Sequence, residues 1–339
     1  MRRASALIAA ALVASAAVPI VLGGRDALWQ ALEFPAHGYV ALLAVVAVSW
    51  FARACKIHWL LHRLNVHVRY RQVFLISLAT DFAFISTPGG VGGYAASVFY
   101  LRRAGAGTSG AATVTAADQL LDWTFFAGAL PLAGIALITS DMPAALAWLA
   151  FSTSALMLAL GAAALFAHRR VGAWLFNDNL LTRRWPRLKR RQHLLREFFH
   201  SLKQHAGILF SGGPGFFAGM LTLSALQWFS RYGVLWVVLA LLGHPVSFAL
   251  TLLLQSLVLH AAMWTGVPSG GGAAEIGLGA ALAAWVPATA IATALLLWRL
   301  ATMYLCLAAG AVAIALLVRT RAEPGATLPG SGAVEQGAP

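Results

Sequence analysis

Six apolar stretches, each long enough to cross a bilayer, limit what this chain can fold into more than any other feature. They cover residues 4–22, 38–56, 110–138, 144–166, 215–242 and 288–318. About 20 consecutive apolar residues form a helix that spans the hydrocarbon core of a membrane. The composition agrees, because only 10% of the 339 residues are charged, against roughly 25% in soluble domains. We therefore predict an all-α polytopic membrane protein with about six transmembrane helices, and we exclude an ordinary soluble enzyme.

Two further apolar stretches, residues 72–101 and 247–286, are interrupted in the middle by proline and glycine. The interruptions read Pro88-Gly89-Gly90-Val91-Gly92-Gly93 and Pro268-Ser269-Gly270-Gly271-Gly272. Non-helical backbone at membrane depth is tolerated only where protein or a wet cavity satisfies its amide groups. Each stretch is long enough for two half-crossings. We therefore predict two re-entrant helical hairpins.

The basic residues predict how the chain sits in its membrane. Lys and Arg number 24 against 11 Asp and Glu, for a formal charge of +13. Placing the N-terminus inside puts 20 of the 24, Lys56 among them, on the cytoplasmic side and leaves only Arg25 outside. We expect a multi-pass protein of the bacterial cytoplasmic (inner) membrane with both termini in the cytoplasm, although the first segment could equally be a signal peptide. The excess charge then attracts anionic inner-leaflet lipid, and we expect no nucleic-acid partner.

The sequence also repeats itself. Ser49-Trp50-Phe51-Ala52-Arg53 returns in the second half of the chain as Gln227-Trp228-Phe229-Ser230-Arg231, and the glycine interruptions return at nearly the same offset. Each half then holds a span, a hairpin and a second span, and the charge-based orientation makes the two halves an inverted repeat. Inverted repeats with broken helices near the midplane are typical of secondary transporters.

This repeat divides the chain into five parts. Residues 1–37 hold the first span and an external loop, residues 38–138 the first repeat, and residues 215–318 the second. Residues 139–214 hold an extra span and a basic amphipathic loop, which we expect to lie on the inner leaflet. Residues 319–339 are polar and rich in glycine and proline, so we expect a disordered tail.

Charged residues inside the predicted membrane region mark the candidate site, because each costs several kcal/mol there unless it is paired or hydrated. The cations are Arg53, Arg231 and Arg299, and the carboxylates are Asp81, Asp118, Asp122 and Glu275. The two carboxylates near the end of a span, Asp118 and Asp122, fit hydrated surface groups about as well as functional ones.

The two interruptions suggest an anion site. Half-helices that start after Gly93 and Gly272 would aim unpaired N–H groups and the positive ends of their dipoles at a ligand. Arginine adds bidentate contacts to phosphate. Asp81 and Glu275 would neutralise the arginines while the site is empty. His260, in the second hairpin, fits a structural role better than a proton relay.

Several of these motifs resemble a known family. Pro268-Ser269-Gly270-Gly271-Gly272 with Glu275, together with Leu120-Leu121-Asp122 and Arg299-Leu300, is similar to the flippase family typified by the membrane part of lysylphosphatidylglycerol synthases, the multiple peptide resistance factors. The resemblance covers about residues 40–318. It departs from the family at Tyr94, where related chains often carry an acidic residue, at Gln119, whose repeat partner is an arginine, and at Ser269, which replaces a glycine.

The resemblance implies movement of a polar-headgroup lipid between leaflets, namely a phospholipid, an aminoacyl-phospholipid, a hopanoid or an isoprenoid-linked lipid. We predict a flippase that works by alternating access at the two hairpins. The alternatives are an integral membrane lipid-headgroup transferase and a non-transporting scaffold. The sequence carries no nucleotide-phosphate loop and no zinc-ligand spacing, so we expect neither a cofactor nor a metal. Only a short tail follows residue 321, so we expect no aminoacyltransferase activity, and the glycine-rich spans permit a homodimer.

Overall fold

The structure, a computed structural model, describes residues 2–140, 142–176 and 186–319, and every regular element in these ranges is a helix. The long helices are α1 (Arg2–Leu32), α2 (Ala36–Arg63), α5 (Gly107–Ile138), α6 (Ala144–Phe176), α8 (Pro186–Phe210) and α9 (Gly213–Leu241), and α12 (Ala288–Arg299) and α13 (Leu305–Arg319) form another one together. The shorter ones are α3 (Tyr70–Ser86), α4 (Val91–Leu101), α10 (Phe248–Met263) and α11 (Ala273–Leu282). Two 3-10 turns, η1 (Pro88–Gly90) and η3 (Pro268–Gly270), and two π-helices, η2 (Arg102–Ala106) and η4 (Leu300–Tyr304), complete the described part. The predicted all-helical class is confirmed, and the predicted tail lies outside the described residues.

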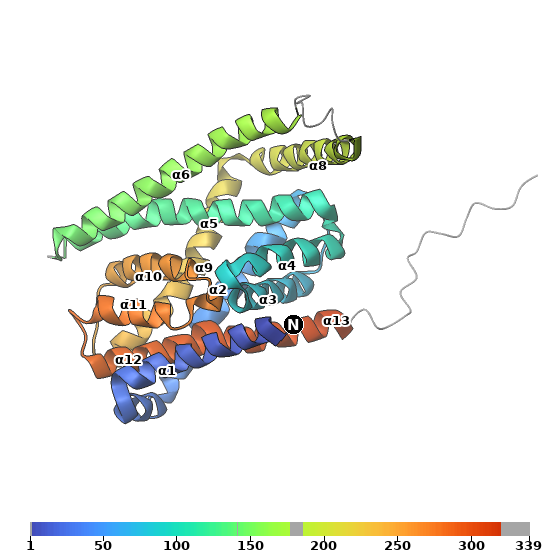
Figure 1. Cartoon of the computed structure of the whole chain (residues 1–339). Helices are drawn as coiled ribbons and strands as arrows, with labels where there is room; N and C mark the ends of the chain where they lie inside the picture. The colour runs from blue at the N-terminus through green and yellow to red at the C-terminus, as the bar shows by residue number, and fades with distance from the viewer. Residues whose placement is uncertain (1, 141, 177–185, 320–339) are drawn as a thin grey trace, which may run out of the picture.

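Five helical stretches are long and apolar enough to cross a membrane, and a sixth is added if the bent pair α8 and α9 is taken as one span. These stretches include the six apolar spans expected from the sequence, and the third, Pro88–Ile138, also includes the second arm of the predicted first hairpin. The bend between α8 and α9 measures 95°, so α8 runs across the direction of α9 and beside α5 (Figure 1).

The order of elements in one half of the chain returns in the other. A long helix (α2 or α9) is followed by two short helices joined at a 3-10 turn (α3, η1 and α4, or α10, η3 and α11) and then by a long helix (α5, or α12 continued by α13). In Figure 1, α6 runs along α5 at one edge and α1 runs along α12 at the opposite edge, with the four short helices between them. The two turns η1 and η3 contact each other.

The two halves meet along α2 and α9 and along α3 and α13. Near the end of α2, Arg63 stacks on Phe216 near the start of α9, with 6.0 Å from the guanidinium carbon to the ring centroid. About two turns farther along both helices, Lys56 on α2 hydrogen-bonds to Ser224 on α9 at 3.1 Å. Residue numbers fall on α2 as they rise on α9, so these two helices, which hold the same place in the two halves, run antiparallel.

The two interruptions break their helices for the same reason. A proline begins each 3-10 turn, and the next two residues take left-handed backbone angles, with φ of 60° and 70° at Gly89 and Gly90, and 55° and 62° at Ser269 and Gly270. A left-handed pair cannot continue a right-handed helix. The first half-helix then begins at Val91, before Gly92 and Gly93 rather than after them as predicted, and Gly93 leaves room for the ring of Phe84.

Helix α1 packs against the second half. Gly23 leaves room for Ala292 of α12, and a Cβ added at Gly271 would lie 2.5 Å from the carbonyl oxygen of Ala11. Tyr304 donates a hydrogen bond to the carbonyl of Leu12 at 2.8 Å. Helix α1 is therefore a packed part of the fold that covers the second interruption.

Candidate functional site

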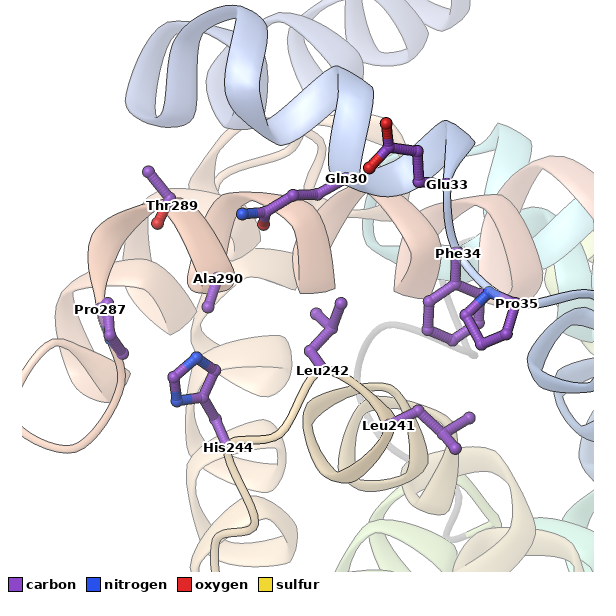
Figure 2. Close-up of a pocket in the computed structure, with 10 residues that line it drawn as sticks. All are labelled: Gln30, Glu33, Phe34, Pro35, Leu241, Leu242, His244, Pro287, Thr289 and Ala290. Carbon is purple, nitrogen blue, oxygen red and sulfur yellow. The ribbon is translucent and has the colours of Figure 1, made fainter.

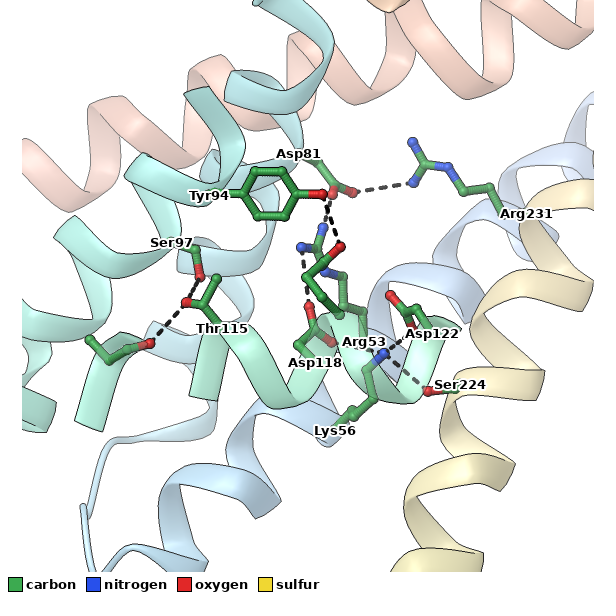
Figure 3. Close-up of polar contacts among 12 residues, drawn as sticks. Arg53, Lys56, Asp81, Tyr94, Ser97, Thr115, Asp118, Asp122, Ser224 and Arg231 are labelled. Carbon is green, nitrogen blue, oxygen red and sulfur yellow. Dashed lines mark hydrogen bonds and ion pairs between the residues drawn. The ribbon is translucent and has the colours of Figure 1, made fainter. Parts of the chain in front are cut away.

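A buried carboxylate joins the two halves beside the contact between α2 and α9. Asp81 on α3 accepts a hydrogen bond through Oδ1 from Arg53 of α2, and through Oδ2 from Arg231 of α9 at 3.3 Å. The two arginines occupy equivalent positions, each at the end of one of the repeated Trp-Phe motifs. Figure 3 shows Asp81 between them. The predicted neutralisation of the arginines by Asp81 is therefore present, with one carboxylate serving both halves.

Lys56 extends this cluster. The charge distribution counts it among the cytoplasmic cations, and in the structure its side chain is fully buried, 2.8 Å from Asp118 Oδ1 and 2.5 Å from Asp122 Oδ1. Arg53 Nη2 also lies 3.5 Å from Asp118 Oδ2. Asp118 and Asp122 are thus buried partners rather than hydrated surface groups.

The sequence does contain a signal for Lys56. It lies three residues after Arg53, on the same face of one helix, and Asp118 lies four residues before Asp122 on one face of another. With these spacings, the two cations on one helix can pair with the two carboxylates on the other if the two faces meet. The predicted apolar span ends at Lys56. Treating Lys56 as the end of the span hides its pairing with Asp118 and Asp122.

The cluster is balanced in charge and unequal in exposure. Three cations, Arg53, Lys56 and Arg231, face three carboxylates, Asp81, Asp118 and Asp122. Burying an unpaired charge is far more costly than burying a neutral set, so balance permits this cluster inside the fold. The side chain of Arg231 is 24% exposed, against 9% for Arg53 and 0% for Lys56. Arg231 is therefore the member that a ligand reaches most readily.

Unpartnered polar atoms lie in the two repeated motifs that carry the arginines. The indole N–H groups of Trp50 and Trp228, which are repeat equivalents, are buried and make no hydrogen bond of standard geometry in the described part of the chain; Trp228 lies beside Asp122 and Trp50 beside Cys306. Nε of Arg53 and Oε1 of Gln227 are also buried without a partner in this part of the chain. Buried polar groups normally pair with protein or water, so this region has capacity for water or a polar ligand.

A second ion pair fastens the second hairpin to α12. Arg299 Nε lies 2.6 Å from Glu275 Oε1, and both side chains are nearly or fully buried. Glu275 Oε2 accepts the N–H of Gly272 at 2.8 Å, which caps the start of α11. Arg299 also donates to the hydroxyl of Ser269 at 3.1 Å and to its carbonyl at 3.4 Å. The anion position predicted at Gly272 is thus occupied by the protein's own carboxylate.

The first hairpin carries a neutral pair at the matching positions. To within one position, Tyr94 and Gln119 hold the places in the first half that Glu275 and Arg299 hold in the second. The Tyr94 hydroxyl donates to Gln119 Oε1 at 3.2 Å, and Tyr94 is 39% exposed. At the start of α4, Thr87 Oγ1 accepts the N–H of Gly92 at 2.9 Å. Two of the departures noted in the sequence, Tyr94 and Gln119, therefore compensate each other. Tyr94 takes the place of the acid and Gln119 that of the arginine, so neither charge is left without a partner.

Comparison with known families decides what kind of chain this is. Residues 6–310 match the lysylphosphatidylglycerol synthase TM region. The chain belongs to this family. None of the curated proteins compared matches it. It is therefore a multi-pass membrane protein of a lipid-related family, and the resemblance predicted from its glycine motifs is confirmed.

Within this member of the lysylphosphatidylglycerol synthase TM family, a cavity lies at each end of the α2 and α9 pair. One, of about 370 Å³, is bordered by the start of α2 and the end of α9 and includes Gln30, Glu33, His244 and Thr289 (Figure 2). The other, of about 340 Å³, is lined by His58, Trp59, His62, Arg63 and Phe216. The charge cluster lies between them along the same helices. In the described residues no group of three or more His, Cys, Asp or Glu side chains is placed to hold a metal.

His260 has a local role in the structure. Its Nδ1 lies 2.5 Å from the carbonyl oxygen of Ser256, one turn earlier in α10. Its ring packs edge-on against Phe126, with the centroids 5.8 Å apart. These contacts fit the structural role preferred from the sequence.

Proposed function

We propose that this protein is a lipid flippase that moves a polar-headgroup lipid between the leaflets of the bacterial inner membrane. The observation that carries the proposal is the sharing of Asp81 by Arg53 and Arg231, equivalent residues of the two halves. A cluster of this kind is costly inside a membrane protein, and such charges mark transport pathways by default. Membership of a lipid-related membrane family supports the same conclusion.

The arrangement of the halves supports alternating access. Helices α2 and α9 hold the same place in each half and run antiparallel, which is the relation that an inverted repeat requires. The interruptions η1 and η3 lie against each other, so the two hairpins meet as they do in transporters whose broken helices form the binding site. In this proposal the hairpins are re-entrant, both termini face the cytoplasm, and rocking of one half against the other exposes the cluster to each leaflet in turn.

The chemistry of the cluster suits an anionic headgroup. A lipid phosphate replaces Asp81 as the partner of Arg231, the more exposed arginine, while Arg53 keeps Asp81 neutralised. The guanidinium binds phosphate through two parallel N–H bonds. The indole N–H groups of Trp50 and Trp228, which make no hydrogen bond of standard geometry in the described structure, are further donors near the arginines.

Two other functions receive less support. A headgroup transferase needs a free acid or base, whereas Asp118 and Asp122 are both paired with Lys56. A non-transporting scaffold gives no reason for six charges to be buried together, because an apolar core would hold the halves at lower cost.

Reconstitution into vesicles tests the proposal. In protein-free vesicles with fluorescent phosphatidylglycerol in both leaflets, dithionite quenches only the outer leaflet; we expect the protein to make the inner-leaflet probe accessible as well. Arg231→Gln should abolish this movement, and Arg319→Gln, at an exposed position at the end of α13, should leave it unchanged. The same assay should be run with aminoacyl, hopanoid and isoprenoid-linked probes. Wild-type protein that moves none of them contradicts the proposal.

A further inference from the structure

The cavity at the far end of the α2 and α9 pair lies outside the charge cluster and has a chemistry of its own. Its lining combines three cationic or titratable side chains, His58, His62 and Arg63, with two aromatic ones, Trp59 and Phe216. It opens at the end of α2 that the distribution of basic residues predicts to be cytoplasmic. Basic and aromatic side chains together are typical of the headgroup level of a membrane.

The guanidinium of Arg63 is available for a ligand. Its planar group stacks on Phe216, and one nitrogen is 3.4 Å from the Ser211 hydroxyl. No carboxylate of a described residue lies within salt-bridge distance of it. A stacked guanidinium that makes only one long hydrogen bond to a hydroxyl keeps N–H donors for the oxygens of a phosphate.

Neighbouring groups support the same ligand. Nδ1 of His58 is buried and has no hydrogen-bond partner in the part of the chain that the structure describes, and the His58 ring packs edge-on against Tyr70. His62 is exposed and its ring packs against His67. Trp59 packs against α9 at Gly219 and keeps 49% of its surface exposed. The cavity therefore offers fixed donors beside an exposed indole that can contact a glycerol backbone or acyl chain.

The cavity and the charge cluster lie along the same face of α2. Arg63, Lys56 and Arg53 are seven and three residues apart, so they lie on one face of α2. On α9 their neighbours are Phe216, Ser224 and Arg231 in reverse order. A line of cations thus runs from the cavity to Asp81 along the contact between the two halves.

The opposite cavity differs in charge. Its lining holds the carboxylate of Glu33 and, among the described residues, neither Lys nor Arg. An anion therefore favours the cavity beside Arg63 over the one beside Glu33. We propose that the cavity lined by His58, Trp59, His62, Arg63 and Phe216 binds the phosphodiester of an anionic phospholipid. A further step, in which the lipid passes from this cavity to the charge cluster, rests on the flippase function proposed above.

Fluorine NMR of protein labelled with fluorotryptophan tests the binding. The protein is placed in phosphatidylcholine nanodiscs, the Trp59 signal is identified with Trp59→Phe, and the fraction of phosphatidylglycerol is raised in steps. We expect a saturable shift of the Trp59 signal. Arg63→Gln should weaken the apparent affinity about tenfold, the effect of one charge-assisted hydrogen bond, and His62→Gln should weaken it less. Arg319→Gln removes an equal charge and should leave the affinity unchanged.

Other outcomes overturn the assignment. If inorganic phosphate alone shifts the Trp59 signal as phosphatidylglycerol does, the site binds a free ion rather than a lipid. If the shift does not saturate, or Arg63→Gln and His62→Gln leave it intact, the cavity does not bind the headgroup. Arg231→Gln separates this inference from transport, because it should abolish translocation and leave the Trp59 titration unchanged. Normal titration with no translocation by the wild-type protein would reject the flippase and keep the binding site.

Discussion

In the first hairpin, the exposed Tyr94 donates a hydrogen bond to Gln119 at 3.2 Å, whereas at the equivalent positions of the second hairpin the buried Glu275 and Arg299 form an ion pair at 2.6 Å. The surroundings differ in the same sense. The residue after the second 3-10 turn, Gly271, packs on the backbone of α1, and its counterpart Val91 is 67% exposed. The two hairpins share an order of elements and differ in how firmly they are held.

This difference assigns unequal parts to the two hairpins. The second is fastened by an ion pair, by a carboxylate cap on α11 and by α1. In the first hairpin, α3 is held by the ion pairs of Asp81 and by its packing on α13, whereas α4 has a neutral pair and a hydroxyl cap from Thr87. Regions with few buried contacts open at lower free energy. We therefore expect α4 of the first hairpin to move during transport while α11 of the second stays fixed.

The largest effect should come from Glu275→Gln, which leaves Arg299 buried without a charged partner. Breaking one side of a buried pair costs about 3 to 5 kcal/mol, and this should appear as a large loss of thermal stability in detergent. Replacing both residues, as Glu275→Leu with Arg299→Met, should recover much of the loss. Equal stability of Glu275→Gln and the wild type would show that the ion pair does not hold this hairpin.

Lys56→Met should have the next largest effect. It leaves Asp118 and Asp122 four residues apart and facing each other without their shared cation, at a cost of about 3 kcal/mol. The triple variant with Asp118→Asn and Asp122→Asn should be more stable than Lys56→Met alone. If Lys56→Met unfolds at the wild-type temperature, the buried position of Lys56 is wrong.

Gly271→Ala should lower the free energy of unfolding by a smaller amount, about 1 to 3 kcal/mol, because the added methyl group forces α1 away from the second interruption. Val91→Ala at the matching, exposed position should change the free energy of unfolding by no more than about 0.5 kcal/mol. Chemical denaturation of both variants measures the contrast directly. Equal losses would mean that α1 does not fasten the second hairpin more tightly than its surroundings fasten the first.

The smallest effect should come from Tyr94→Phe. It removes one partly exposed hydrogen bond to Gln119, worth about 0.5 to 1 kcal/mol, and leaves no buried charge behind. Its unfolding temperature should lie close to that of the wild type and well above that of Glu275→Gln. A loss comparable to Glu275→Gln would remove the distinction between the hairpins.

Much of the fold follows from the sequence because membrane helices obey simple constraints. Apolar length locates the spans, and proline followed by glycine locates both interruptions, since left-handed backbone ends a helix wherever it occurs. The predicted start of α4 is too late because Gly92 and Gly93 are compatible with the first turn of a helix once Thr87 packs against Gly92 and Phe84 against Gly93.

The candidate site is less accessible to sequence reasoning. The charged residues can be named, but their partners depend on how α2, α3, α5 and α9 pack, which no local pattern specifies. Counting Lys56 only as a cytoplasmic cation misses its buried ion pairs, because a window of hydropathy cannot show that two carboxylates on another helix face it. The sharing of Asp81 by two equivalent arginines requires the antiparallel contact of the two halves, which only the structure supplies.

The most direct test of the central claim is whether lipid crosses when η1 and the end of α10 are tied together. In a variant lacking Cys55 and Cys306, Gly89→Cys and Met263→Cys place thiols across the contact between the first interruption and the second hairpin, where a Cβ at Gly89 lies 3.9 Å from the Met263 carbonyl oxygen. A short, reducible bis-thiosulfonate linker should stop translocation of fluorescent phosphatidylglycerol, and a reductant should restore it. An unchanged rate in fully cross-linked protein would contradict passage between the two hairpins.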